Sequence, residues 1–198
     1  MFVGWSDQMK SEYEVVQIPY SATKDWILNI HYAKRMPSIS FAYGLYRYDE
    51  MVGMVSYGTP ASPFLCKGIC GQEHKKSVIE LNRLVLKDNL PNEASFLVSR
   101  SLKLLPKPKV VVSYADTAQD HAGIIYQACN FLFTGTTKPR TDMAGSEGKH
   151  SRHHLGDRKN RINRSAKHRY VYFIGSKKDK KTLRNALKYT IEDNYPKY

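Results

Sequence analysis

The run KVVVSYAD at residues 109–116 limits the fold more than any other feature, because it is almost continuously apolar and rich in β-branched residues. A strand of this kind is expected to be covered on both faces. The residues after it change to a helical pattern, HAGIIYQACN at 121–130, with Asp120 as the predicted cap. A fully covered strand followed by a helix predicts a layered α/β fold.

The other hydrophobic patterns predict an order of strands and helices around this unit. A hairpin is expected over 40–58 with its turn at YDE, and residues 59–76 are expected to form a loop or a short helix. Further strands are predicted at 13–20, 77–86, 131–137 and 169–175, and helices at 21–35, 89–105 and 180–194, with Ser21 and Asn92 as N-caps. The order predicts one α/β (α+β) domain over 1–198, with a mixed, mostly antiparallel central sheet and helices on both faces.

The positive charge is concentrated late in the chain. The net charge is +13, and residues 138–184 carry 15 Lys and Arg against four Asp and Glu. A field of this density suits a polyanion, because neutralised phosphates release counterions. The alternative is a solvated charge run. The segment 138–169 is predicted to be a basic, DNA-contacting insertion before the last strand, in which the DNA-facing residues are Arg152, Arg158, Lys159, Arg161, Arg164, Lys167, His168 and Arg169.

The cysteines and the apolar runs indicate a soluble protein of the cytoplasm. Three cysteines form no disulfide framework, and no run approaches the length of a membrane span. Cys66, Cys70 and His74 have helical ligand spacing for zinc, although this spacing is a weak signal. Free thiols are the alternative.

The end of the strand at 109–116 is the predicted site of chemistry. Open α/β sheets bind ligands outside the carboxyl ends of their strands, and Tyr114 and Asp116 lie there. Asp116 is a candidate base, and the alternative is a turn cap or an ion-pair partner. Arg83 with Asn92 and Ser95 is the predicted anion-binding set for a cofactor or a DNA phosphate. Glu80 and Arg83, three apart on a strand, are expected on opposite faces.

Several segments together resemble a known family. IHYAKRMPSISFAYGLY, IELNRLVLKDNLPNEASFLVSRSLKLL, VVSYADTAQDHAGIIYQACNFLFTG and KHSRHHLGDRKNRINRSAKHRYVYFIG are similar to the Mom family of bacteriophage DNA-modification proteins, over roughly residues 26–175. The resemblance implies an acetyltransferase-like (GNAT) fold and conversion of adenine N6 in duplex DNA to a carbamoylmethyl derivative. It also implies protection of phage DNA from restriction and dependence on iron.

The places of the residues in the predicted fold, together with the resemblance, suggest roles for individual residues, and a buried structural tyrosine is the alternative for Tyr126. Asp116 would accept an N6 proton, Tyr126 would act as the general acid, and Tyr114 and His121 would complete the catalytic group. By residue type, His31, Tyr32 and Asp116 could hold the iron if the fold brings them together. The alternative for His31 is a hydrogen-bonding residue at a helix end. The base must leave the stack, so Tyr43, Tyr57 and Tyr114 are predicted to form an aromatic pocket.

The donor of the two-carbon group stays open. Acetyltransferases bind coenzyme A with a Gly-rich turn after the fourth strand, where this chain has KDNLPNEAS. Acetyl-coenzyme A and an aminoacyl carrier such as a charged tRNA are both possible donors. Two rival functions remain, an N-acetyltransferase acting on a small amine or protein and a non-catalytic DNA-binding phage protein. A methyltransferase is disfavoured, because no strand precedes a Gly-x-Gly turn.

Overall fold

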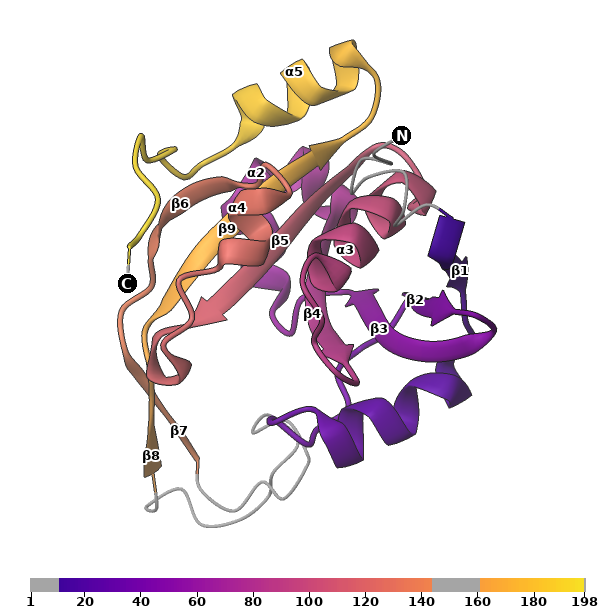
Figure 1. Cartoon of the computed structure of the whole chain (residues 1–198). Helices are drawn as coiled ribbons and strands as arrows, with labels where there is room; N and C mark the ends of the chain where they lie inside the picture. The colour runs from indigo at the N-terminus through magenta and orange to yellow at the C-terminus, as the bar shows by residue number, and fades with distance from the viewer. Residues whose placement is uncertain (1–10, 144–160, 198) are drawn as a thin grey trace.

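A seven-stranded sheet forms the centre of the computed structural model, which describes residues 11–143 and 161–197 (Figure 1). The strand order is β1-β2-β3-β4-β5-β9-β6, and every neighbouring pair is antiparallel except β4 and β5. The mixed, mostly antiparallel sheet that the sequence predicts is therefore confirmed. The bounds are β1 Tyr13–Gln17, β2 Phe41–Arg47, β3 Glu50–Gly58, β4 Val78–Leu86, β5 Lys109–Asp116, β6 Leu132–Thr136 and β9 Lys167–Ile174.

Helices cover both faces of this sheet. The helices α3 (Glu93–Leu104) and α4 (Ile124–Ala128) lie in front in Figure 1, whereas α2 (Pro63–His74) lies behind. On β5, Val111 packs in the core cluster that includes residues of α3, while Val110 and Val112 pack with residues of α2 and α5 (Lys177–Ala186). Successive strand residues point to opposite faces, so this alternation explains why the whole run is apolar.

Two predicted helices are shorter and less regular than expected. In place of a helix over 21–35 there are a 3-10 turn, η1 (Tyr20–Thr23), and a π-helical turn, η2 (Trp26–Ile30), and the N-cap is Pro19 rather than Ser21. The predicted cap Asp120 instead ends a 3-10 turn, η4 (Thr117–Gln119), with a left-handed backbone at φ 52°. The helix α4 then starts only after Gly123, at φ 76°. His121 therefore precedes the helix that carries Tyr126.

The basic region contributes an element that the sequence does not predict. The strands β7 (Arg140–Met143) and β8 (Arg161–Arg164) pair with each other as a separate two-stranded ribbon, which extends from the main sheet in Figure 1. Arg140 lies directly opposite Arg164 in this ribbon. Arg152, Arg158 and Lys159 lie outside the described residues.

The remaining helices agree more closely with the sequence patterns. Residues 59–76 contain a helix, α2, with a kink at Cys70 and Gly71, followed by the short turn η3 (Lys75–Ser77). The helix α5 begins at Lys177 and ends at Ala186, whereas the basic pattern predicts 180–194. None of the helices in the described part of the chain has the length and apolar character that a membrane span requires.

Candidate active site in a two-sided cleft

The sheet opens between β4 and β5. The two strands pair only at Val78–Glu80 and Val110–Val112 and then diverge. At the point of divergence the hydroxyl of Ser113 donates to the carbonyl of Leu81 at 3.1 Å, in place of a ladder bond. The opening forms a cleft of about 1890 Å³. Glu80, at the last paired position of β4, therefore marks the apex of this cleft.

The cleft has two chemically different sides. On β4, Ile79 packs in the α3 core and Val78 in the α2 core, so Glu80 points to the α2 face of the sheet. The same alternation on β5 and β9 places three more side chains on the α2 face, those of Tyr114, Lys167 and Arg169. The other side is lined by Tyr126 and by the start of α3 with Asn92 and Ser95. The α2 side is therefore basic, while the α3 side presents a helix N-terminus.

The bulge on β4 brings Glu80 and Arg83 into the same cleft. Ser56 of β3 is opposite Arg83 while Tyr57 is opposite Leu81, so Asn82 has no partner in the register. The Asn82 side chain accepts from the hydroxyl of Ser56 at 2.7 Å and donates to the carbonyl of Ser38 at 2.7 Å. The bulge removes one step of the alternation. The prediction of opposite faces for Glu80 and Arg83 is therefore wrong, and both residues line the cleft.

Glu80 is the site residue that sequence reasoning did not assign. Burial raises the pKa of its carboxyl to about 7, although Arg83, Lys167 and Arg140 favour the charged form. The structure shows no hydrogen bond or ion pair between this carboxyl and another described side chain. A carboxyl that titrates near neutrality and is not occupied by a partner suits proton transfer. The only sequence signal was its place on a strand that enters the cleft.

Asp116 lies at the rim of the cleft and is fully engaged. Its carboxylate pairs with the ammonium of Lys167 at 2.5 Å, accepts from the hydroxyl of Ser165, and accepts from the backbone N–H of Ala118 at 3.1 Å. Burial alone would raise the pKa of this carboxyl, but these hydrogen bonds lower it. Asp116 is not among the described residues that line the cleft. Its predicted role as a proton acceptor stays a prediction, and its geometry favours a positioning role.

Tyr126 and Tyr114 line the cleft on its opposite sides. The Tyr126 ring packs between Phe131 and Tyr170, at centroid distances of 5.5 and 5.3 Å. Burial raises the pKa of Tyr126 to about 12, and a hydrogen bond with the side chain of Ser113 partly offsets this effect. Burial also raises the pKa of Tyr114. Both phenols therefore keep their protons at neutral pH, and each can give a proton to a reacting group.

Three aromatic side chains gather at the cleft beside Arg83. The rings of His31 and Tyr32 stack at 4.4 Å, and Tyr32 meets the edge of His121 at 6.3 Å. Burial lowers the pKa of His31 to about 4, and Arg83 and His121 add to the effect, so His31 is neutral. The structure thus brings together predicted metal and catalytic residues from separate segments.

Two of the predicted iron ligands, His31 and Asp116, have other partners in the structure, and the set with Tyr32 stays a prediction. The Asp116 oxygens are occupied by Lys167, Ser165 and a backbone N–H, and the His31 Nδ1 accepts from the backbone N–H of Ala33 at 3.0 Å. Within residues 11–143 and 161–197, no group of three His, Cys, Asp or Glu could hold a metal. No chemical step is therefore assigned to iron.

The predicted anion-binding set lines the cleft but is not one cluster. Arg83 donates from Nη1 to the carbonyl of Asn82 at 2.6 Å and from Nη2 to that of Arg35 at 2.7 Å, and its buried Nε has no partner in the described structure. Ser95 instead donates to the carbonyl of Asn92 at 3.1 Å. Asn92 has a left-handed backbone and its side chain makes no cap bond. The Glu93 N–H donates to the carbonyl of Leu90 at 3.2 Å, and the next two residues of α3, Ala94 and Ser95, line that side of the cleft.

Two further predicted sites are placed in the core. Tyr43 and Tyr57 are buried and meet edge to face, and the Tyr57 hydroxyl bonds that of Ser101 at 2.6 Å, so these tyrosines cannot form the base pocket. Cys66 and Cys70 are buried free cysteines, and burial raises the pKa of the Cys70 thiol to about 11. The kink at Cys70 breaks the helical spacing on which the predicted zinc site depends.

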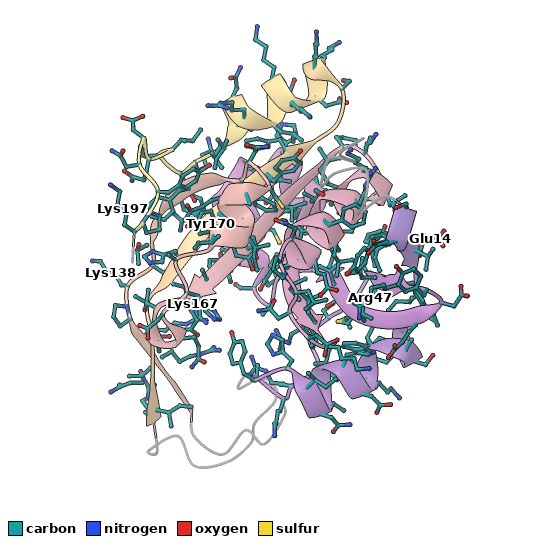
Figure 2. All side chains as sticks on the ribbon, in the orientation of Figure 1. Glu14, Arg47, Lys138, Lys167, Tyr170 and Lys197 are labelled. Carbon is teal, nitrogen blue, oxygen red and sulfur yellow. The ribbon has the colours of Figure 1, made fainter. Side chains whose placement is uncertain are left out.

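Basic residues from β7, β8, β9 and the connection before β7 form the rim of the α2 side. Lys138, Arg140, Arg164, Lys167 and Arg169 line the cleft, and Figure 2 shows Lys138 and Lys167 near each other, far from Glu14 and Arg47. Arg169 stacks on the Tyr189 ring at 3.3 Å. Arg161 donates to the hydroxyl of Thr141 at 2.9 Å within the ribbon, and the imidazole of His168 bonds Thr136 at 2.8 Å.

Comparisons with known proteins show which family the chain matches. The sequence model of the Mom protein family matches residues 12–197. The methylcarbamoylase Mom of Escherichia phage Mu is 31% identical over 112 residues, which cover 54% of this chain and 46% of that protein. The match thus spans about half the length of that relative.

A solved structure gives the same architecture. A structure described as "a probable acetyltransferase" from Staphylococcus epidermidis superposes with a TM-score of 0.50 at 10% identity, covering 82% of this chain and 99% of the other. An N-acetyltransferase from Staphylococcus aureus gives a TM-score of 0.48 at 12% identity, covering 81% of this chain and 98% of the other. The chain has an acetyltransferase-like fold.

Proposed function

The chain belongs to the Mom protein family, and from this premise we propose that it is a transferase that adds a carbamoylmethyl group to adenine N6 in duplex DNA. The phage relative, whose name states methylcarbamoylase activity, supports this reading. In a phage, such a modification would protect DNA from host restriction. The observation that carries the proposal is the two-sided cleft, with basic residues on one side and an unpaired carboxyl, Glu80, at its apex.

DNA would approach from the basic side. Lys138, Arg140 and Arg164 would contact phosphates, and a two-stranded ribbon such as β7–β8 is one of the elements that fit a DNA groove. The target adenine must leave the base stack before its N6 can enter the cleft. Tyr32 and Tyr114, which line the cleft, would contact the extruded base.

Glu80 would take the proton during transfer. The N6 lone pair is delocalised into the adenine ring, so a base that accepts an N6 proton as the bond forms lowers the barrier. In this step N6 forms a bond to the donor's methylene carbon and the bond from that carbon to the leaving group breaks. The N6 proton passes to the Glu80 carboxylate. The leaving group departs with the electron pair and takes a proton from the Tyr126 hydroxyl, which is protonated at neutral pH.

Asp116 would then act as a positioning residue. Its ion pair with Lys167 at 2.5 Å fixes the start of β9 and holds an ammonium group at the rim of the cleft. The donor would lie on the α3 side, where the helix N-terminus favours an anionic group. Coenzyme A and tRNA are both anionic carriers that meet this electrostatic requirement, and the group that they carry must hold a leaving group on its methylene carbon for the step above.

Nucleoside mass spectrometry of plasmid DNA tests the proposal. Plasmid is isolated from cells that express the wild-type chain, Glu80→Gln, Asp116→Asn, or the exposed control Glu50→Gln. The proposal predicts N6-carbamoylmethyl-deoxyadenosine with the wild type and the control, near-complete loss with Glu80→Gln, and partial retention with Asp116→Asn.

Other outcomes separate the alternatives. If Glu80→Gln kept full activity and Asp116→Asn lost all activity, Asp116 rather than Glu80 would be the proton acceptor. Unmodified DNA from cells with abundant wild-type protein would contradict the transferase and favour the DNA-binding alternative. Acetylated small amines or proteins in the same cells, with unmodified DNA, would favour the N-acetyltransferase.

A further inference from the structure

Phe64 is the most exposed large hydrophobic residue in the described part of the chain, with 84% of its surface accessible. It lies in the first turn of α2, directly after Pro63. Leaving a phenyl ring in water forgoes the free energy that burial would supply. A phenyl ring has no polar group that could hydrogen-bond with water. The exposed position of Phe64 is therefore better explained by a binding partner that covers the ring than by a role in the folded core.

Phe64 stands at the rim of the active-site cleft. Residues 59–65 line the cleft together with Lys138, Arg140 and Lys167. The α2 helix behind Phe64 is anchored in the core by Cys66, Ile69 and Cys70. Pro63 restricts the backbone at the start of the helix. A rigidly mounted apolar ring thus shares a cleft with groups that attract phosphates.

We propose that Phe64 is a wedge that enters the base stack of duplex DNA and fills the space left by the extruded adenine. This inference rests on the proposed function, because it assumes that adenine is the substrate. The positive rim selects DNA as the partner over an apolar protein surface or a neutral membrane. Phenylalanine is among the side chains that proteins insert between base steps. The ring would slow the return of the adenine and so extend the time available for transfer.

The test compares paired and unpaired adenines. Extracts of cells expressing the chain supply the donor, and two oligonucleotide duplexes are added that share one adenine-containing strand. In the first duplex every adenine is paired with thymine. In the second, abasic sites face the adenines, so no pairing holds them in the stack. Modification is measured for wild type, Phe64→Ala, Phe64→Leu and the control Tyr48→Ala, which removes an aromatic side chain that is 74% exposed at the β2–β3 turn.

A wedge predicts a loss that depends on pairing. Phe64→Ala should lower modification of the paired duplex about tenfold or more, since base–aromatic stacking has that magnitude. Modification of the unpaired duplex should stay within about twofold of wild type. Phe64→Leu should recover part of the activity on the paired duplex, and Tyr48→Ala should resemble wild type on both.

The remaining outcomes overturn the inference in distinguishable ways. Equal losses on both duplexes would make Phe64 part of the binding pocket or of the α2 structure. No loss on the paired duplex would show that Phe64 does not act in base extrusion. If the wild type modified neither duplex, the result would contradict the proposed function itself.

Discussion

Replacement of Glu80 by Gln should stabilise the protein at alkaline pH. The carboxyl has a pKa of about 7 in the folded chain against an ordinary value of 4.5. Below pH 4.5 both the folded and the unfolded chain hold the proton, so the group contributes nothing to the pH dependence. Between pH 4.5 and 7 the unfolded chain loses the proton first, and stability falls as pH rises. Above pH 7 the full cost of the buried charge is present.

The size of the effect follows from the same values. A pKa raised from 4.5 to about 7 corresponds to at most about 3 kcal/mol. For a chain of this length, that free energy is about 6 to 12 °C in Tm. Thermal unfolding of purified wild type and Glu80→Gln should therefore give a difference of up to this size at pH 8, with the variant more stable. The difference should vanish near pH 4.

Asp116→Asn provides a control of opposite sign. Its carboxyl has a lowered pKa, so its contribution to stability is present at neutral pH and is lost as pH falls through the folded pKa. The Asn variant should therefore be less stable than wild type at pH 7, and the difference in stability should become smaller at acidic pH. If Glu80→Gln were no more stable than wild type at pH 8, or if its advantage were independent of pH, the reasoning about an unpaired carboxyl at the apex would be refuted.

Three further predictions concern packing, the core and the DNA surface. Gly123→Ala should cost about 2 kcal/mol, seen as a lower midpoint in urea, because the residue has φ 76° and its Cβ would lie 2.5 Å from the Tyr170 ring; an unchanged midpoint would contradict this packing. Glu93→Ala should cost about 3 kcal/mol in the same assay, since its buried carboxylate accepts from the Tyr13 hydroxyl at 2.9 Å, and a loss well below 1 kcal/mol would show that the network is dispensable. Arg140→Ala should weaken duplex binding and lower the slope of log affinity against log salt by about one, measured by fluorescence anisotropy; an unchanged slope would remove Arg140 from the phosphate contacts.

Local sequence patterns predict most of the sheet correctly. The hairpin forms at Tyr48 and Asp49, where both residues adopt positive φ values of 49° and 67°. The alternating and continuous apolar runs are local signals, and they place β4, α3 and β5 within a few residues. These elements form the cleft, so the sequence also leads to its approximate location and to Tyr114 and Tyr126 as lining residues.

The features that the sequence does not predict depend on long-range pairing. The bulge at Asn82 exists in the register between β3 and β4, and its side-chain partners Ser38 and Ser56 are distant in the chain. No periodicity in the SVIELNRLVL segment reveals that one residue drops out of the alternation. Glu80 was left without a role for this reason.

The engagement of Asp116 has a similar cause. Its partners Lys167 and Ser165 come from the segment before and within β9, which pairs with β5 only in the folded sheet. The ribbon β7–β8 was also missed, because β8 has no buried face and hence no hydrophobic alternation. Charge density predicts such a segment as a polyanion contact but cannot predict its pairing.

The most direct test of the central claim is to follow the exocyclic nitrogen of adenine. Duplex DNA whose adenines carry ¹⁵N at N6 is incubated with extract of cells that express the wild-type chain, and the nucleosides are fragmented in a mass spectrometer. The account predicts a carbamoylmethyl group attached to the labelled nitrogen, and its absence when Glu80→Gln replaces the wild type. A product with the added group on any other atom, or unmodified adenine from an extract that contains soluble wild-type protein, would contradict it.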